Sequence, residues 1–205
     1  MNTSTHATQI LLGQLAGVVA FCSVIPYIVS IFRGKTKPSR SSYAIWSVVE
    51  IVWVTSYIAA GATTTKWTGI VFAISAVLIF ILSLKYGMGG LNAFDVPCLI
   101  LAGIAILVWV TTKNPILADY MSTLAVFIGY LPIVKKAYLW PDTENTLSWA
   151  LYAIATILTV AALTTLQPAI SLRPFISMTL AIIITSLLLF PKWRYKKELV
   201  SRLSS

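Results

Sequence analysis

Charged residues are scarce in this chain of 205 residues. They make up 10% of it, against roughly 25% in a soluble domain. Hydrophobic residues make up 58%, and the mean hydropathy is +0.87. This composition excludes an ordinary water-soluble fold and predicts an all-α membrane protein. The net charge is +9, but the sequence contains no soluble basic domain on which it could lie. We therefore expect no nucleic-acid partner, and we interpret the charge as a topology signal.

The residue types that most often carry enzyme chemistry are also few. The chain has one histidine, His6, near its N-terminus, and two cysteines, Cys22 and Cys98, both inside apolar segments. Cysteines in such segments behave as small buried hydrophobic residues rather than as a disulfide or a metal site. The sequence shows no nucleophile and base arrangement, no metal-ligand spacing and no phosphate-binding motif. We expect neither an enzyme nor a metal site nor a cofactor.

Long apolar runs are what the chain does contain. A helix needs about 20 mainly apolar residues to cross the hydrocarbon core of a bilayer. Glycine and proline mark most of the breaks between runs of this kind. Seven transmembrane helices are therefore expected, at residues 10–32, 43–61, 67–86, 94–112, 115–138, 147–165 and 170–190.

Lysine and arginine predict the orientation, because cytoplasmic loops carry an excess of both. With the N-terminus outside, the outer loops hold three basic residues: Lys66, Lys113 and Arg173. The inner loops then hold twelve: Arg33, Lys35, Lys37, Arg40, Lys85, Lys135, Lys136, Lys192, Arg194, Lys196, Lys197 and Arg202. The N-terminus is accordingly expected outside and the C-terminus in the cytoplasm, in a bacterial inner membrane.

One pattern occurs twice along the chain. Ser23-Val24-Ile25-Pro26-Tyr27 ends the first apolar segment and leads to Thr36-Lys37-Pro38-Ser39-Arg40-Ser41. Gly129-Tyr130-Leu131-Pro132-Ile133 ends the fifth and leads to Thr143-Glu144-Asn145-Thr146-Leu147-Ser148. Four helices separate the two prolines, so both copies would enter the membrane in the same direction. The pattern predicts two parallel repeats about an axis along the membrane normal.

This repeat divides the chain into five parts. A short outside N-terminal tail (1–9) precedes the first three-helix repeat (10–90). A linker helix (91–113) joins it to the second three-helix repeat (114–190), and a basic cytoplasmic tail (191–205) follows. An odd number of linker helices keeps the two repeats parallel.

The plan and its motifs resemble the SWEET and PQ-loop transporter superfamily. The run Gly34-Lys35-Thr36-Lys37-Pro38 with Trp46, and Asn114-Pro115 after Trp109, are similar to bacterial proteins on this fold. The resemblance implies seven helices in a three-one-three plan, moving a small solute by alternating access. Tyr27 and Ile133 stand where the superfamily has its glutamine, and the paired asparagines of SWEET sugar pockets are missing. The resemblance therefore implies transport without implying a sugar.

Glu50 is the residue whose burial in a membrane segment costs the most free energy. It lies about eight residues into the second span, roughly 12 Å deep and close to the bilayer midplane. An acid at that depth should face the bundle interior and either find a partner or hold its proton. Two interpretations stay open: a proton-coupling or solute-contacting group, or a protonated acid hydrogen-bonded to a neighbouring helix.

Aromatic and polar residues on the first two helices of each repeat complete the candidate site. Such residues suit a small, partly polar solute. Pro26 and Pro132 are expected hinges, because a proline removes one helical hydrogen bond. The expected binding or gating residues are Gln14, Tyr27, Trp46, Glu50, Trp53, Asp119, Tyr130 and Trp149. The expected partners are a small-molecule solute and the lipid bilayer, and a homo-oligomer is left open.

A different class of function shares this fold. The alternative is a seven-helix receptor, or a membrane interaction or assembly protein, that performs no transport. A receptor for a peptide terminus needs a charged pocket. With Arg173 counted in an outer loop, the intramembrane basic residues that such a pocket needs are expected to be missing. That expectation favours transport.

Overall fold

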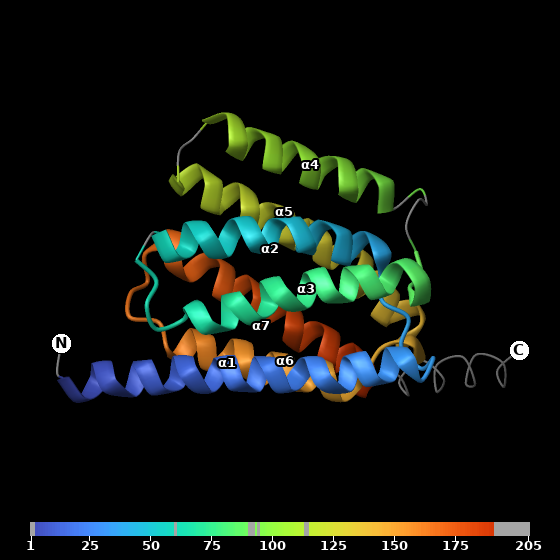
Figure 1. The fold of residues 1–205 in the computed structure, drawn as a ribbon, viewed down its shortest axis with the longest axis horizontal. Helices are drawn as coiled ribbons and strands as arrows, with labels where there is room; N and C mark the ends of the chain where they lie inside the picture. Colours follow the sequence, from blue (N-terminus) through green and yellow to red (C-terminus); the bar gives the residue numbers. More distant parts are fainter. Residues whose placement is uncertain (1–2, 60, 90–92, 94, 113–114, 191–205) are drawn as a thin grey trace, which may run out of the picture.

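The computed structural model of the protein describes residues 3–59, 61–89, 93, 95–112 and 115–190. Within these residues the chain is all-helical and has no named β-strand. The expected basic tail at 191–205 lies outside the described residues. Figure 1 shows the helices running side by side as one elongated bundle. They are α1 (Thr3–Phe32), α2 (Arg40–Ala59), α3 (Lys66–Tyr86), α4 (Asp95–Thr112), α5 (Pro115–Leu139), the 3-10 turn η1 (Pro141–Thr143), α6 (Thr146–Ala161) and α7 (Pro168–Leu189).

The helix boundaries follow the expected spans, with two differences. Helix α1 begins at Thr3, so most of the expected tail at 1–9 is helical. The side chain of Gln9 donates to the carbonyl of Leu163 at 2.8 Å, which holds the extra turns against the α6–α7 connection. Helix α6 ends at Ala161, and the expected span at 147–165 is too long by about one turn.

Among the described residues, four helical segments are long and apolar enough to cross a membrane: His6–Phe32, Lys66–Tyr86, Asp95–Thr112 and Ile170–Leu189. Large apolar side chains also cover the outer surface of the bundle, with Leu11 65% exposed, Ile74 65% and Leu107 62%. A soluble monomer rarely exposes large contiguous apolar patches. These features are compatible with an integral membrane protein.

The helices before α4 and those after it make contacts in the same order, and we call these two sets, α1–α3 and α5–α7, the two groups. Helix α3 packs against both α1 and α2, and α7 packs against both α5 and α6. Between the groups, α1 contacts α6 and α2 contacts α5. Helix α4 packs mainly on α5 and lies at the edge of the bundle in Figure 1. Close approach depends on small residues: a Cβ added at Gly13 of α1 would lie 1.8 Å from the carbonyl oxygen of Thr64.

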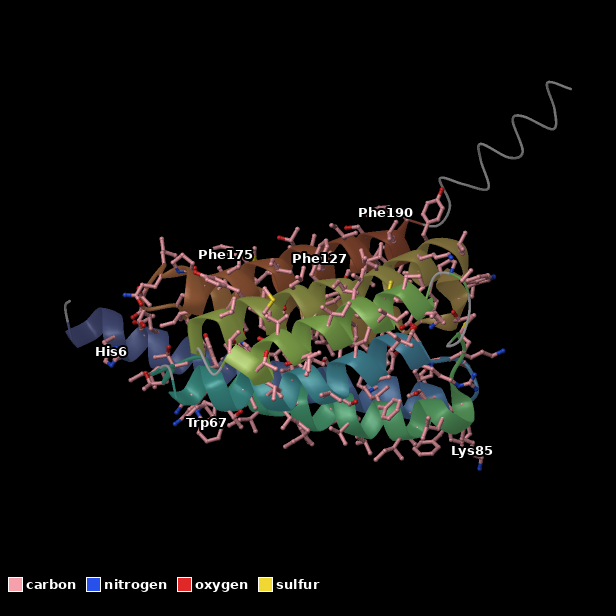
Figure 2. The ribbon with its side chains drawn as sticks, turned by 90° about the horizontal axis from the view of Figure 1, so that it is seen from above. His6, Trp67, Lys85, Phe127, Phe175 and Phe190 are labelled. Carbon is pink, nitrogen blue, oxygen red and sulfur yellow. The ribbon has the colours of Figure 1, made fainter. Side chains whose placement is uncertain are left out.

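The bundle has two chemically different ends. We call "the basic end" the one with the α1–α2 connection, the α3–α4 connection and η1, and "the N-terminal end" the opposite one. Figure 2 shows the N-terminal end by Trp67 and the basic end by Lys85, at opposite ends of α3. Seven of the nine described basic residues lie at the basic end: Arg33, Lys35, Lys37, Arg40, Lys85, Lys135 and Lys136. Backbone bonds tie its loops together, among them Lys37 N–H to the Thr143 carbonyl at 3.0 Å.

Candidate functional site

A cavity lies in the middle of the bundle, between α1, α2, α3, α5 and α6. Its volume is about 80 Å³, several times what one ordered water needs. Rings from all five helices line it: Tyr27, Tyr43, Trp46, Phe72, Tyr130, Trp149 and Tyr152. Among its described lining residues, Glu50 is the only one that carries a charge. The cavity therefore combines aromatic walls with one carboxyl group.

Helical spacing explains how these rings reach one cavity. Residues three apart share one face of a helix, and two such pairs occur: Tyr43 with Trp46 on α2, and Trp149 with Tyr152 on α6. Their ring centroids are 5.2 and 5.5 Å apart, each pair edge to face. Trp46 also contacts the Tyr130 ring of α5 at 4.7 Å. The two pairs thus line the cavity from helices that occupy corresponding places in the two groups.

Gly129 provides the space that Trp46 occupies. A Cβ added at Gly129 would lie 2.5 Å from the Trp46 indole nitrogen, closer than real Cβ contacts allow. The indole N–H points to the carbonyl of Val126 at 3.4 Å. The glycine before Tyr130 therefore leaves room for a ring that lines the cavity.

On the side toward the N-terminal end, Glu50 pairs with Arg173 of α7. Glu50 Oε1 and Arg173 Nη2 are 2.6 Å apart, and both side chains are buried. The guanidinium lies over the Trp53 ring, 4.1 Å from its centroid. Glu50 Oε2 and Arg173 Nη1 are buried without a hydrogen-bond partner in the described part of the chain. A second, smaller cavity lies beyond the pair and is lined by Glu50, Trp53 and Arg173 among others.

This pair corrects the assignment of Arg173 to an outer loop. Pro168 starts α7 before Arg173, whose side chain is only 4% exposed. Glu50 has thus found a partner, one of the two outcomes expected of a buried acid. The available signal was the cost of Glu50 itself. A carboxyl group buried deep in a bundle needs a basic partner, and Arg173 is a basic residue within the expected seventh span, near its start.

On the side toward the basic end, Glu144 holds a second buried group together. Its carboxylate pairs with Lys136 of α5. It also accepts from the Tyr27 hydroxyl at 3.0 Å and from the Trp149 indole N–H at 2.8 Å. Glu144 therefore links α1, α5 and α6. Sequence reasoning treated it as a loop residue, and only its place in the repeated Thr-x-x-Thr-x-Ser pattern distinguished it.

The residue next to Glu144 fixes the start of α6. The Asn145 side-chain oxygen accepts from the Ser148 backbone N–H at 2.9 Å, the bond of a helix N-cap. Its amide group donates to the Pro26 carbonyl at 3.4 Å. This contact joins the loop of one group to the proline of the other.

The structure brings together five of the expected site residues. Tyr27, Trp46, Glu50, Tyr130 and Trp149 line the central cavity. Trp53 instead lines the second cavity, where it stacks on Tyr57 with centroids 4.5 Å apart.

The two remaining expected residues, Gln14 and Asp119, have different outcomes. Gln14 is exposed on α1, because the inward face of that helix carries Gly13, Ala16 and Gly17. Contrary to expectation, Gln14 does not line the central cavity. Asp119 belongs to α5, but its side chain lies outside the described residues.

The two expected hinges occupy similar places. Pro26 lies inside α1 and Pro132 inside α5, each about two turns before the helix ends. Pro174 is a third proline inside a helix, directly after Arg173 in α7. Within the described residues, no group of three histidine, cysteine or acidic side chains could hold a metal ion.

No protein-family model, curated protein or solved structure matches this chain. The fold and the cavity define an all-helical protein with apolar membrane-compatible helices and a polar group buried at each side of an aromatic cavity.

Proposed function

We propose that this protein is an integral membrane transporter that moves a small solute by alternating access, on the SWEET and PQ-loop plan. The observation that carries the proposal is the central cavity with a buried ion pair on each side of it along the bundle. A transporter needs a site between two barriers that open in turn. The pairs Glu50–Arg173 and Lys136–Glu144 are our candidates for these barriers.

Two parallel three-helix repeats joined by α4 are the architecture that we propose. The shared helix order of the two groups supports it, because α3 and α7 each pack against both other helices of their group. Tyr43 and Trp149 are as many positions apart as Pro26 and Pro132 are. The same spacing holds for Trp46 and Tyr152. Pro26 and Pro132 are the proposed hinges, since both lie toward the basic end.

Glu50 is the proposed proton-coupling residue. Protonation would neutralise the carboxylate and leave Arg173 without its counter-charge. The contact between α2 and α7 would then weaken at the N-terminal end. Coupled transport needs a group of this kind, with access to each side in turn.

We propose the orientation that the basic residues favour. The basic end would face the cytoplasm and the N-terminus the outside. Lys35 is exposed in the α1–α2 connection and Thr63 in the α2–α3 connection, so substitutions at these positions can report the two sides.

A receptor on the same fold is the second candidate, and Arg173 is the observation that favours it. The guanidinium of Arg173 is buried, and its Nη1 has no hydrogen bond among the described residues. The lack of a basic group inside the bundle can therefore no longer be used against a receptor. Glu50 cancels the charge of Arg173, which makes a pocket for an anionic peptide terminus less suitable. A receptor would offer its site to one side of the membrane only.

The access of a cavity residue from both sides separates these functions. Ser148 lines the cavity, so we would introduce Ser148→Cys in a chain with Cys22 and Cys98 changed to serine. An impermeant thiol reagent should label it in right-side-out vesicles and in inside-out vesicles. Tyr27→Phe, which removes one donor to Glu144, should raise labelling from the basic end and lower it from the other.

Exposed reference positions make this labelling interpretable. Lys35→Cys and Thr63→Cys should each be labelled from a single side, which also tests the orientation. Labelling of Ser148→Cys from one side alone, unchanged by Tyr27→Phe, would contradict alternating access and favour the receptor.

A further inference from the structure

We propose that the central cavity selects a small organic cation, an amine or a quaternary ammonium. This inference rests on the proposed function and names the class of its solute. Three properties of the cavity carry it: where its hydrogen-bond donors point, which surfaces remain, and where the charges lie.

The hydrogen-bond donors around the cavity are largely engaged within the protein. The hydroxyl of Tyr27 and the indole N–H of Trp149 both donate to Glu144, and the indole of Trp46 points to a backbone carbonyl. The serine hydroxyls of the lining likewise donate to acceptors in their own segments: Ser23 to Ala20, Ser75 to Val71 and Ser148 to Asn145. The Tyr130 and Tyr152 hydroxyls bond to each other at 2.6 Å.

What remains for a solute is mainly acceptors and ring faces, with the hydroxyls of Tyr43 and of one member of the Tyr130–Tyr152 pair as the remaining donors. A hydroxyl that donates inside the protein still has lone pairs to offer. Glu50 Oε2 is a buried acceptor without a partner in the described part of the chain. A polyhydroxyl solute needs donors as well as acceptors, and an anion needs donors alone. A solute that brings its own donors or a positive charge fits this cavity better than either.

The arrangement of charge favours the same class of solute. Aromatic faces attract a cation within about 6 Å of the ring centroid, and quaternary ammonium groups are bound in this way by aromatic cages. Rings on five helices surround the cavity, and Glu50 is the single charged residue of its described lining. Arg173 lines the second cavity instead, on the far side of the carboxylate and against Trp53. A bound cation would therefore meet Glu50 before it meets Arg173.

A matched pair of probes tests the charge directly. Choline and 3,3-dimethyl-1-butanol have the same shape, but only choline carries a positive charge. We would titrate purified full-length protein in detergent with each probe, and with tetramethylammonium, by isothermal titration calorimetry. The expected result is binding of both cations and at least tenfold weaker binding of the uncharged alcohol.

Two substitutions of the same chemistry locate the binding. Phe72→Leu removes a ring face from the cavity wall and breaks no side-chain hydrogen bond, because a phenyl ring makes none. It should weaken choline binding about fivefold. Phe127→Leu removes a ring that is 40% exposed on the outer surface of α5 (Figure 2), and it should leave binding unchanged. Trp46→Leu should weaken binding about tenfold.

Equal binding of choline and the alcohol, or no binding of either cation to the wild-type protein, would overturn the inference. Equal effects of Phe72→Leu and Phe127→Leu would overturn it too. The labelling of Ser148→Cys needs no solute, so access from both sides without cation binding would retain the transporter and reject only this class of solute.

Discussion

The two buried ion pairs differ in how completely their atoms are bonded. At the basic end, the Glu144 carboxylate pairs with Lys136 and accepts hydrogen bonds from Tyr27 and Trp149. Toward the N-terminal end, Glu50 pairs only with Arg173, and Glu50 Oε2 and both Nη atoms of Arg173 have no hydrogen bond among the described residues. The two sites are similar in burial and in charge. They differ in the number of donors around the carboxylate.

This difference indicates two different uses of a buried charge. A fully bonded network stabilises a unique packing, because each member would be costly to leave unpaired. A partly bonded pair costs stability, and the remaining bonds are then available to a ligand, a water or a proton. The Glu144 network therefore fits a structural lock, while the Glu50–Arg173 pair fits a site that changes its partners. Substitutions in the two pairs test this contrast.

Glu144→Ala should have the largest effect on stability. It would leave the Lys136 ammonium buried and unpaired, and it would remove the acceptor of Tyr27 and Trp149. We expect the free energy of unfolding to fall by about 5 kcal/mol, the upper range for a broken buried pair. Unfolding by detergent titration, followed by circular dichroism, would measure it.

Asp142→Ala provides the control, since Asp142 is exposed in η1 two residues away. It should change the free energy of unfolding by less than about 0.5 kcal/mol. If both variants unfold at the same point, the Glu144 network is not the lock that we describe.

Single changes in the Glu50–Arg173 pair should cost less. Glu50→Gln and Arg173→Gln each leave one buried charge alone, and we expect about 3 kcal/mol for each. The double variant Glu50→Gln with Arg173→Gln should recover more than half of that loss, because no charge is left unpaired. The same unfolding measurement applies to all three proteins.

Transport by the same variants sharpens the comparison. In proteoliposomes, wild-type uptake of a cation identified by titration should respond to an imposed pH gradient, and Glu50→Gln uptake should not. An identical response of both proteins would make Glu50 a structural residue and the protein a facilitator.

Gly129→Ala should have the smallest effect, and it acts on the cavity between the two pairs. The added Cβ would lie 2.5 Å from the Trp46 indole nitrogen, so the ring must move. We expect a loss of about 2 kcal/mol, typical of overpacking. Gly103→Ala is the control, because a Cβ there meets nothing within 4 Å. An alanine should make that part of α4 slightly more stable. Equal stabilities would show that Gly129 does not set the position of Trp46.

The helix positions were the part of the fold that could best be predicted from the sequence. The expected spans agree with the helices to within a few residues at most boundaries, because proline and glycine punctuate long apolar runs. The early start of α1 at Thr3 was missed, since a span predicted from apolarity ends where the apolar run ends, while the helical backbone continues. Of the site, Trp46, Glu50 and Trp149 could be chosen as polar or aromatic residues in unusual places.

The contacts that these residues make could not be predicted as well. Arg173 was assigned to a loop, although a turn of helix places it beside Glu50. Gln14 was chosen for its polarity, although its face of α1 points away from the bundle. Glu144 gave no signal of burial, because loop residues with charge are usually solvated.

The all-helical class, the apolar segments and the free-energy cost of burying Glu50 could be predicted from the sequence alone, because they depend on composition and on local periodicity. Only the tertiary structure decided which residues meet. Glu50 joins Arg173 across 123 positions of the chain, and Tyr27 joins Glu144 across 117. Such contacts depend on how far each helix is rotated about its axis and how closely glycines let helices approach. No local pattern in a single chain records that rotation.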